Sequence, residues 1–276
     1  MGKCKYCGKD AGFFKSKHPA CEERHAAGCA RLEAILTECF DTKTDFYTRR
    51  GEVLALFGNS FIDSDDMTRI YVGALDRAVE RYLDDGLVDA EEERMVARFM
   101  QFSELSQQVL NANRSLEKVV QSKVLMELLN GRIPKPNITI TGDFPFLLSK
   151  NENILWMFRG ITLLQQKVRR EYRGRSSGVS MRVCKGVYYR TGGFRGTPVE
   201  TSYMAHIGTG SVCLTDKNLY FHSPEKSLKI PISKILSLEP YSNGLGLQKD
   251  GANDKPMFFE NLNSWFCYNA ITNLKQ

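Results

Sequence analysis

Residues 210–221 read GSVCLTDKNLYF, and this stretch decides how the C-terminal half of the chain folds. Two short apolar runs stand on either side of the polar residues Asp216, Lys217 and Asn218. Short apolar runs separated by turn residues are typical of β-strands. We therefore predict two strands, at 211–215 and 219–222, joined by a short turn.

The same alternation of short strands and glycine-rich turns continues on both sides of this stretch. Further strands are predicted at 154–158, 179–183, 186–190, 228–230, 235–238 and 257–260. A helical pattern at 262–274 follows the last of them. Several strands followed by one helix predict a strongly bent sheet that is capped by the helix.

The middle of the chain has a different periodicity. Between 31 and 130 the apolar residues recur three and four positions apart, which predicts amphipathic helices. Gly86 suits the end of one helix, and Asp89 with Glu92 forms a capping box that begins the next. A further helix is predicted at 106–129. The middle is thus a bundle of four or five helices, and the fold class of the chain is α+β.

Four of the eight cysteines fall within the first thirty residues. A disulfide framework is typical of short secreted chains, whereas this chain has 276 residues and begins without the apolar segment of a signal peptide. We therefore expect reduced cysteines. Cys4 and Cys7 are separated by two residues and followed by Gly8, a spacing that allows two thiolates to bind one tetrahedral ion.

The second half of this metal site is expected in the residues that follow. His18 and Cys21 are also separated by two residues, and Pro19 between them suits the first position of a helix. His25 is an alternative, because it lies one helical turn after Cys21 on the same face, and Cys29 continues that face. We predict one structural Zn²⁺ per chain, held by Cys4, Cys7, Cys21 and either His18 or His25.

The net charge of +6 is unevenly distributed along the chain. Residues 1–30 carry +3, residues 31–130 carry −7 and residues 131–276 carry +10. Charge balance tends to follow domains, since it reflects the surface that each presents. We therefore predict three domains: a zinc-binding module at 1–30, a helical domain at 31–131 and a β domain at 140–276.

The densest basic stretch lies at 167–175. On alternate positions of a strand, one face would present Lys167, Arg169, Glu171, Arg173 and Arg175. The basic run would then contact an anionic partner, such as phospholipid head groups, nucleic-acid phosphates or an acidic protein surface. Two other interpretations stay open: a charged face that prevents edge pairing, or a contact with the acidic helical domain of the same chain. The predicted binding residues are Lys167, Arg169, Arg170, Arg173 and Arg175.

Parts of the chain resemble known domain families. Residues 210–221 look like the core G-x-L-x-L-T-x-x-x-L-x-F of GRAM and bacterial pleckstrin-homology (PH)-like domains, and LKIPISKI at 228–235 looks like the strand and turn that follow it. YLDDGLVDAEEE at 82–93 resembles the helix–DG–helix signature of TerB-like domains. The order of a zinc knuckle, a helical middle and a PH-like end is similar to a family of bacterial proteins. This resemblance implies seven strands and one helix, used for lipid head groups or protein ligands.

The motifs G-x-S-x-G, H-E-x-x-H and the phosphate-binding loop do not occur in a supporting sequence context. We therefore expect a non-enzymatic multidomain adaptor that binds a protein or an anionic membrane surface, and the TerB-like resemblance implies bacterial stress or phage-response signalling. The alternatives are a nucleic-acid-associated protein that uses the zinc module and the basic strand, and a hydrolase whose catalytic residues meet only in the fold. Because no apolar run is long enough to cross a membrane, we expect a cytoplasmic protein, including one that is peripheral at the inner membrane surface.

Overall fold

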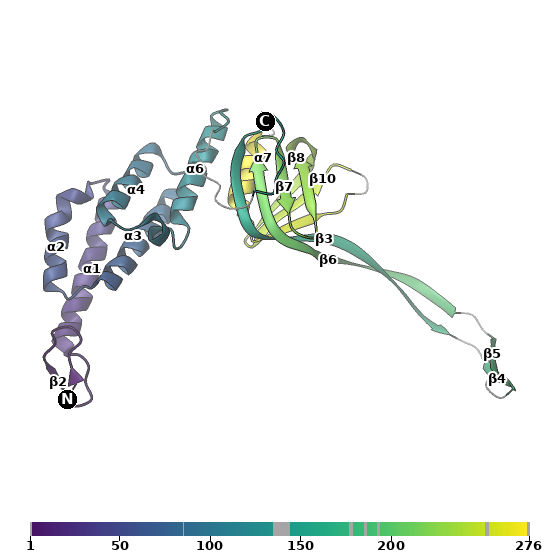
Figure 1. Cartoon of the computed structure of the whole chain (residues 1–276), viewed down its shortest axis with the longest axis horizontal. Coiled ribbons are helices and arrows are strands. Elements are labelled where there is room, and N and C mark those ends of the chain that lie inside the picture. Colours follow the sequence, from purple (N-terminus) through teal and green to yellow (C-terminus); the bar gives the residue numbers. More distant parts are fainter. Residues whose placement is uncertain are drawn as a thin grey trace. The chain divides into compact units, whose positions relative to one another are not determined.

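The chain forms two compact units, 1–130 and 131–276, in the computed structural model (Figure 1). The part of the chain that the structure describes comprises residues 2–84, 86–134, 144–176, 179–184, 187–191, 194–251 and 254–274, with the backbone alone from 168 to 201. The predicted α+β class is confirmed, with helices in the first unit and an antiparallel sheet in the second. The division into three domains stays a prediction, and the first long helix continues across its boundary at residue 30.

The N-terminal unit begins with two short antiparallel strands, β1 (Gly2–Lys3) and β2 (Asp10–Gly12). The helical elements that follow are α1 (Pro19–Asp41), η1 (Phe46–Arg49), α2 (Arg50–Asn59), α3 (Ser64–Asp84), α4 (Ala90–Ser103), α5 (Gln107–Leu110) and α6 (Ser115–Leu129). Three fully buried phenylalanines from α1, η1 and α4 meet in the core, with ring centroids 4.9–5.1 Å apart: Phe40, Phe46 and Phe99. The helices therefore bury the apolar faces that their periodicity predicts.

The start of α4 confirms the predicted capping box. The side chain of Asp89 accepts from the backbone N–H of Glu91 and Glu92, and the side chain of Glu92 accepts from the backbone N–H of Asp89. These contacts satisfy N–H groups that have no partner within the helix.

The single helix predicted at 106–129 is wrong, because the chain forms α5 and α6 with a break between them. Arg114 has a left-handed backbone, with φ of 62°. The Asn111 side chain accepts from the backbone N–H of Glu117, and Ser115 donates to Asp76 of α3 at 2.5 Å. Short polar side chains that form hydrogen bonds with the nearby backbone or with a neighbouring helix compete with the hydrogen bonds of the helix itself. The spacing of apolar residues gives no information about this competition.

The C-terminal unit is a seven-stranded antiparallel sheet in the order β8-β7-β6-β3-β11-β10-β9. Its strands are β3 (Ile154–Ser176), β6 (Phe194–Thr215), β7 (Asn218–His222), β8 (Ser227–Pro231), β9 (Ile235–Tyr241), β10 (Gly244–Lys249) and β11 (Met257–Glu260), with η2 (Ile232–Lys234) between β8 and β9. Sequence patterns did not predict β10. A separate two-stranded sheet pairs β4 (Val179–Cys184) with β5 (Val187–Thr191). The predicted closing helix is α7 (Ser264–Leu274), which packs against β9 and β10.

The seven-stranded sheet is strongly bent, as predicted. Phe221 of β7 and Phe259 of β11 are three strands apart, a separation of about 14 Å in a flat sheet. Their ring centroids nevertheless lie 6.1 Å apart, and both side chains are buried. Phe266 of α7 fills the same interior, 5.5 Å from the ring of Trp156 on β3. The sheet therefore curves around one core, and α7 closes it.

Strands β3 and β6 are far longer than the predicted strands at 154–158 and 211–215. They pair continuously from Ile154 opposite Thr215 to Ser176 opposite Phe194. In the described residues, β3 from Lys167 onward and β6 up to Tyr203 pair with each other alone, and Figure 1 shows them leaving the sheet as a two-stranded ribbon. The prediction stopped too early because the apolar pattern ends where the strands no longer cover a core. We call these two paired segments, residues 167–176 of β3 and 194–203 of β6, the ribbon.

Candidate metal centre

Cys4 and Cys7 are held by a tight turn between β1 and β2. The backbone N–H of Cys4 donates to the carbonyl of Lys9 at 2.7 Å, and the N–H of Gly8 donates to the carbonyl of Cys4 at 2.9 Å. Gly8 has φ of +72°, a left-handed conformation that glycine adopts without steric cost. The turn therefore places the two sulfur atoms on the same side of the backbone, as the Cys4-x-x-Cys7-Gly8 spacing predicts.

His18 and Cys21 lie at the start of α1. His18 is the N-cap, with an extended backbone, and Pro19 occupies the first helical turn. The backbone N–H of Cys21 donates to the carbonyl of His18 at 3.1 Å. This confirms the predicted helix start, with one candidate ligand at the cap and the other in the first turn.

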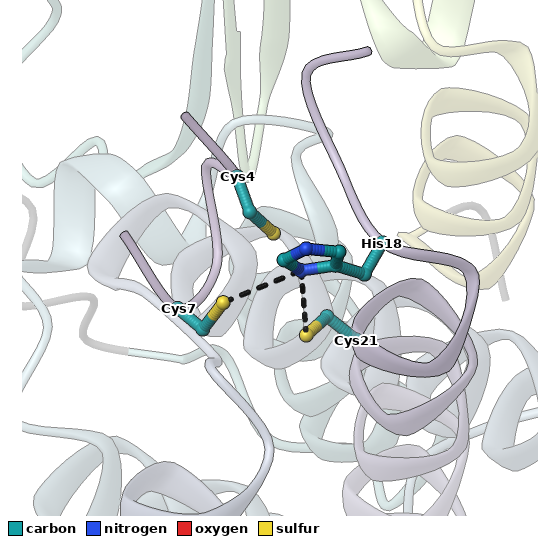
Figure 2. Close-up of side chains that lie close together, drawn as sticks. All are labelled: Cys4, Cys7, His18 and Cys21. Atoms are coloured by element: carbon teal, nitrogen blue, oxygen red, sulfur yellow. Dashed lines mark hydrogen bonds between the residues drawn. The ribbon is translucent and has the colours of Figure 1, made fainter. Parts of the chain in front are cut away.

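The four side chains point toward one another (Figure 2). His18 Nδ1 lies 3.4 Å from Cys7 Sγ and 3.8 Å from Cys21 Sγ, and the four candidate ligand atoms all lie within 4.8 Å of one another. A tetrahedral ion with metal–sulfur distances of about 2.3 Å and a metal–nitrogen distance of about 2.0 Å separates its ligand atoms by about 3.5–3.8 Å. The group formed by Cys4, Cys7, His18 and Cys21, here called the Cys3His group, can therefore hold a metal ion.

A second contact orients the imidazole of His18. Its Nε2 lies 2.9 Å from the backbone carbonyl oxygen of Asp10, to which it donates. The hydrogen on Nε2 leaves the lone pair of Nδ1 directed at the thiols, which is the usual arrangement of a metal-binding histidine. Strand β2, which contains Asp10, therefore orients a side chain of α1.

The sulfur atoms of the Cys3His group affect one another's ionisation. Burial opposes the ionisation of Cys4, but the backbone N–H groups of Cys7, His18 and Tyr6 outweigh it and lower the pKa of Cys4 to about 6. Burial, together with the thiols of Cys7 and Cys4, raises the pKa of Cys21 to about 11. One thiolate thus forms readily and opposes the next, and a bound cation relieves this repulsion.

His25, the alternative fourth ligand, lies outside the Cys3His group. It forms a second group with Cys29 and Asp66, whose candidate ligand atoms also lie within 4.8 Å of one another. Asp66 is in α3, so spacing within the first thirty residues could not reveal this group. The other cysteines whose side chains are described are buried among hydrophobic residues: Cys39, Cys213 and Cys267.

The predicted basic residues lie on β3, in the ribbon. Their backbone positions pair with β6, with Lys167 opposite Tyr203 and Arg175 opposite Arg195. The side chain of Lys167 is exposed, whereas the side chains of the remaining four lie outside the described residues: Arg169, Arg170, Arg173 and Arg175. The structure therefore places these positions on one paired strand, and their role as a binding site stays a prediction.

A half-buried carboxylate network around Glu152, just before β3, was not predicted from the sequence. Glu152 accepts from the side chains of Thr215 at 2.5 Å, Asn218 at 2.8 Å and Tyr220 at 2.9 Å, and from the backbone N–H of Ser149 at 2.8 Å. Burial opposes its ionisation, but these four donors outweigh it and lower the pKa of Glu152 to about 2. The carboxylate thereby fixes the turn between β6 and β7, within the stretch that decides the fold.

Comparison of the chain with protein-family models, with curated proteins and with solved structures finds no match. In the described ranges, no helix is both long and apolar enough to cross a membrane. The functional conclusions therefore rest on the residues of the chain itself.

Proposed function

We propose that the Cys3His group binds one structural Zn²⁺ per chain. Three thiolates and one imidazole are a common ligand set of structural zinc, and four protein ligands complete a tetrahedral shell without a position for substrate. The strands on either side of Cys4 and Cys7 have two and three residues, too few to enclose a hydrophobic core. The ion would supply the cross-link that this segment needs to fold onto α1.

The two units suggest the domain types that the sequence resembles. The C-terminal unit is proposed to be a GRAM or PH-like domain, which is supported by its bent seven-stranded sheet and the closing helix α7. The helical part is proposed to be TerB-like, supported by the capping box at Asp89 and Glu92, which lie within the resembling stretch. Both assignments favour an interaction protein rather than an enzyme, because such folds serve mainly as scaffolds for binding sites.

The biochemical function that we propose is that of a non-enzymatic adaptor, which contacts an anionic protein or membrane surface through the ribbon. The observation that carries this proposal is the continuous pairing of β3 and β6 beyond the sheet. The two segments of the ribbon contain six lysines and arginines against two acidic residues, a net charge of +4. A ribbon with this excess of positive charge attracts an anionic surface at long range. Bacterial stress or phage-response signalling at the inner membrane surface is the setting proposed from the TerB-like resemblance.

The experiment compares two ligands with the same protein preparations: vesicles containing anionic lipid, assayed by flotation, and double-stranded DNA, assayed by mobility shift. The wild-type chain should float with anionic vesicles at low salt and detach as salt rises, since the screening length falls to about 8 Å at physiological ionic strength. The triple variant Arg169→Glu, Arg170→Glu, Arg173→Glu should lose binding without a change in melting temperature, because surface charges contribute little to stability.

A matched control reverses three exposed lysines in the same unit but outside the ribbon: Lys226, Lys234 and Lys255. This variant has the same net charge as the ribbon variant and should retain most of the binding. Equal loss in both variants would show that net charge alone drives the contact. Unfolding of the ribbon variant, or no binding of wild-type protein to either ligand, would instead assign the basic run to a structural role.

A second candidate function is nucleic-acid binding, which two observations favour. A two-stranded β-ribbon fits the major groove of double-stranded DNA, and phosphate contacts need the cations that the ribbon contains. In the Cys-rich segment, Phe13 and Phe14 are exposed at 75% and 101% beside Lys15, and exposed aromatic rings stack on unpaired bases. A mobility shift without flotation would select this function over the first.

A further inference from the structure

The second group of potential metal ligands is built by two helices. His25 and Cys29 lie one turn apart on the same face of α1, and Asp66 lies in the first turn of α3. His25 Nε2 is 2.6 Å from Asp66 Oδ2 and 3.6 Å from Cys29 Sγ. The side chains of His25 and Asp66 are only 15% and 20% exposed. Three different ligand types thus converge in a partly buried position.

The geometry does not suit a catalytic cysteine with a histidine base. In such a relay the nucleophile faces one ring nitrogen and the carboxylate faces the other, so that a proton can pass through the ring. Here Cys29 and Asp66 face the same nitrogen, Nε2, while Nδ1 lies 3.4 Å from the hydroxyl of Tyr6. A sulfur, an oxygen and a nitrogen that share one centre are arranged for a cation.

Two of the three candidate ligands have an outer partner that orients them. The Tyr6 hydroxyl can accept from Nδ1–H of His25, and the tyrosine ring lies over the imidazole with centroids 4.8 Å apart. Arg69 donates to Oδ1 of Asp66 at 3.0 Å and leaves Oδ2 facing His25. Metal-binding histidines and carboxylates typically have outer hydrogen bonds of this kind.

We propose that His25, Cys29 and Asp66 form a second metal site for a divalent transition ion of the zinc class. The thiolate and the carboxylate balance the two charges of the ion, and nitrogen, sulfur and oxygen ligands together suit zinc or cobalt better than magnesium or calcium. Three protein ligands leave a fourth position for water or a small anion, unlike the closed Cys3His group. Binding displaces the proton that His25 Nε2 shares with Asp66 and the proton of the Cys29 thiol.

The two sites are linked through Tyr6. This residue stands between Cys4 and Cys7, so the turn that forms around the first ion also positions the hydroxyl that orients His25. Tyr6 is therefore a positioning residue for the second site. Tyr6→Phe should weaken binding of the second ion about tenfold, within the range known for lost outer partners.

The test titrates the full reduced, metal-free chain with Co²⁺ in the absence of oxygen. Wild-type protein should bind two equivalents, one with the intense charge-transfer band of three thiolates and one with the weaker band of a single thiolate. Azide should shift only the spectrum of the second ion, because only that ion has an open position. Cys29→Ser should remove the weaker band. Asp66→Asn removes a ligand and should weaken the second equivalent by more than the roughly tenfold expected for loss of an outer partner.

Asp65→Asn is the matched control, because Asp65 is an exposed carboxylate in the same turn of α3. This variant should bind two equivalents, and the melting temperatures of all variants should show that they fold. A single equivalent in wild-type protein, or an unchanged second equivalent in Cys29→Ser, would overturn the proposal and leave an ion pair between His25 and Asp66. A wild-type titration that gives the weaker band but no three-thiolate band would instead refute the structural zinc. Failure of the second site and failure of the first are therefore distinguishable.

Discussion

The Cys3His group of the first unit and the Glu152 network of the second differ in the side chains that form them. The Cys3His group consists of four side chains that offer electron pairs, all within the first 21 residues, and its sulfur atoms oppose one another's ionisation. The Glu152 network is a carboxylate surrounded by donors, three of which come from residues more than sixty positions away. The first centre can hold a cation, which we propose completes it, whereas the second is complete as it stands.

The two units are therefore stabilised in different ways. A group assembled from neighbouring residues can form early, but it stays electrostatically unbalanced until it binds an ion. A group assembled from distant strands needs no ligand, but it forms only after β6 and β7 have paired. We therefore expect the folding of the N-terminal segment to depend on a bound metal ion. The stability of the C-terminal unit should depend on the ionised carboxylate of Glu152.

The largest effect is expected from the double substitution Cys4→Ser, Cys7→Ser. Binding to structural zinc sites contributes about 10–16 kcal/mol in isolated peptides, and folding of such segments is coupled to it. The variant should lose one zinc ion per chain, and residues 1–18 should become sensitive to protease while the helical core stays folded. Elemental analysis and limited proteolysis measure these changes.

Lys3→Ser, Lys9→Ser is the matched control, since both lysines are exposed in the same segment. It should keep its zinc and its resistance to protease. Equal sensitivity in the two variants would mean that the segment does not depend on the cysteines, and the contrast between the two units would disappear.

A smaller effect is expected from Glu152→Gln in the C-terminal unit. A hydrogen bond to a charged group contributes about 1.5–3 kcal/mol, and the amide keeps part of the network, so the loss should be roughly 2 kcal/mol at pH 7. Denaturant unfolding followed through the tryptophan fluorescence of this unit measures it. Glu260→Gln, on β11, is the control and should change stability by less than about 0.5 kcal/mol.

The pKa of Glu152 also predicts how the stability of the C-terminal unit depends on pH. The pKa of Glu152 in the folded protein is about 2, below its ordinary value of 4.5, so the folded state favours the ionised form. The stability that Glu152 contributes is therefore present above pH 4.5 and is lost as the pH falls from 4.5 toward 2. The difference in stability between wild-type protein and Glu152→Gln should shrink over this range, and a constant difference would contradict the assignment.

The smallest effect is expected at Asp89, whose carboxylate, like that of Glu152, already has its donors. Asp89→Ala removes the cap of α4 and should destabilise the helical core by about 1 kcal/mol. Asp84→Ala, at the last residue of α3, is the control and should cause no loss, because a negative charge at the C-terminal end of a helix is not favourable. Thermal unfolding followed by circular dichroism compares the two.

The sequence predicted those features that depend on residues close together in the chain. The Cys3His group follows from two pairs of residues separated by two positions, and the start of α4 follows from Asp89 and Glu92. The spacing alone could not choose between His18 and His25, because both are compatible with Cys21 on a helix. In the structure His18, and not His25, lies beside the three cysteines. Its ring is held there by a hydrogen bond to the carbonyl of Asp10, across the segment between β2 and α1.

Features that depend on distant residues were not predicted. Glu152 stands in a polar loop, and nothing nearby indicates that it will meet Thr215 and Tyr220. Asp66 meets His25 only because α1 packs against α3. The full length of β3 and β6 was also missed, since their pairing continues without the apolar alternation by which strands are recognised.

The proposed zinc site is best tested by zinc analysis of the full chain, purified without added metal and combined with titration of its native thiols. The Cys3His group predicts at least one zinc ion per chain, with Cys4, Cys7 and Cys21 protected from thiol reagents until a chelator is added. Protein without zinc, in which these three thiols react as fast as they do in the unfolded chain, would contradict it.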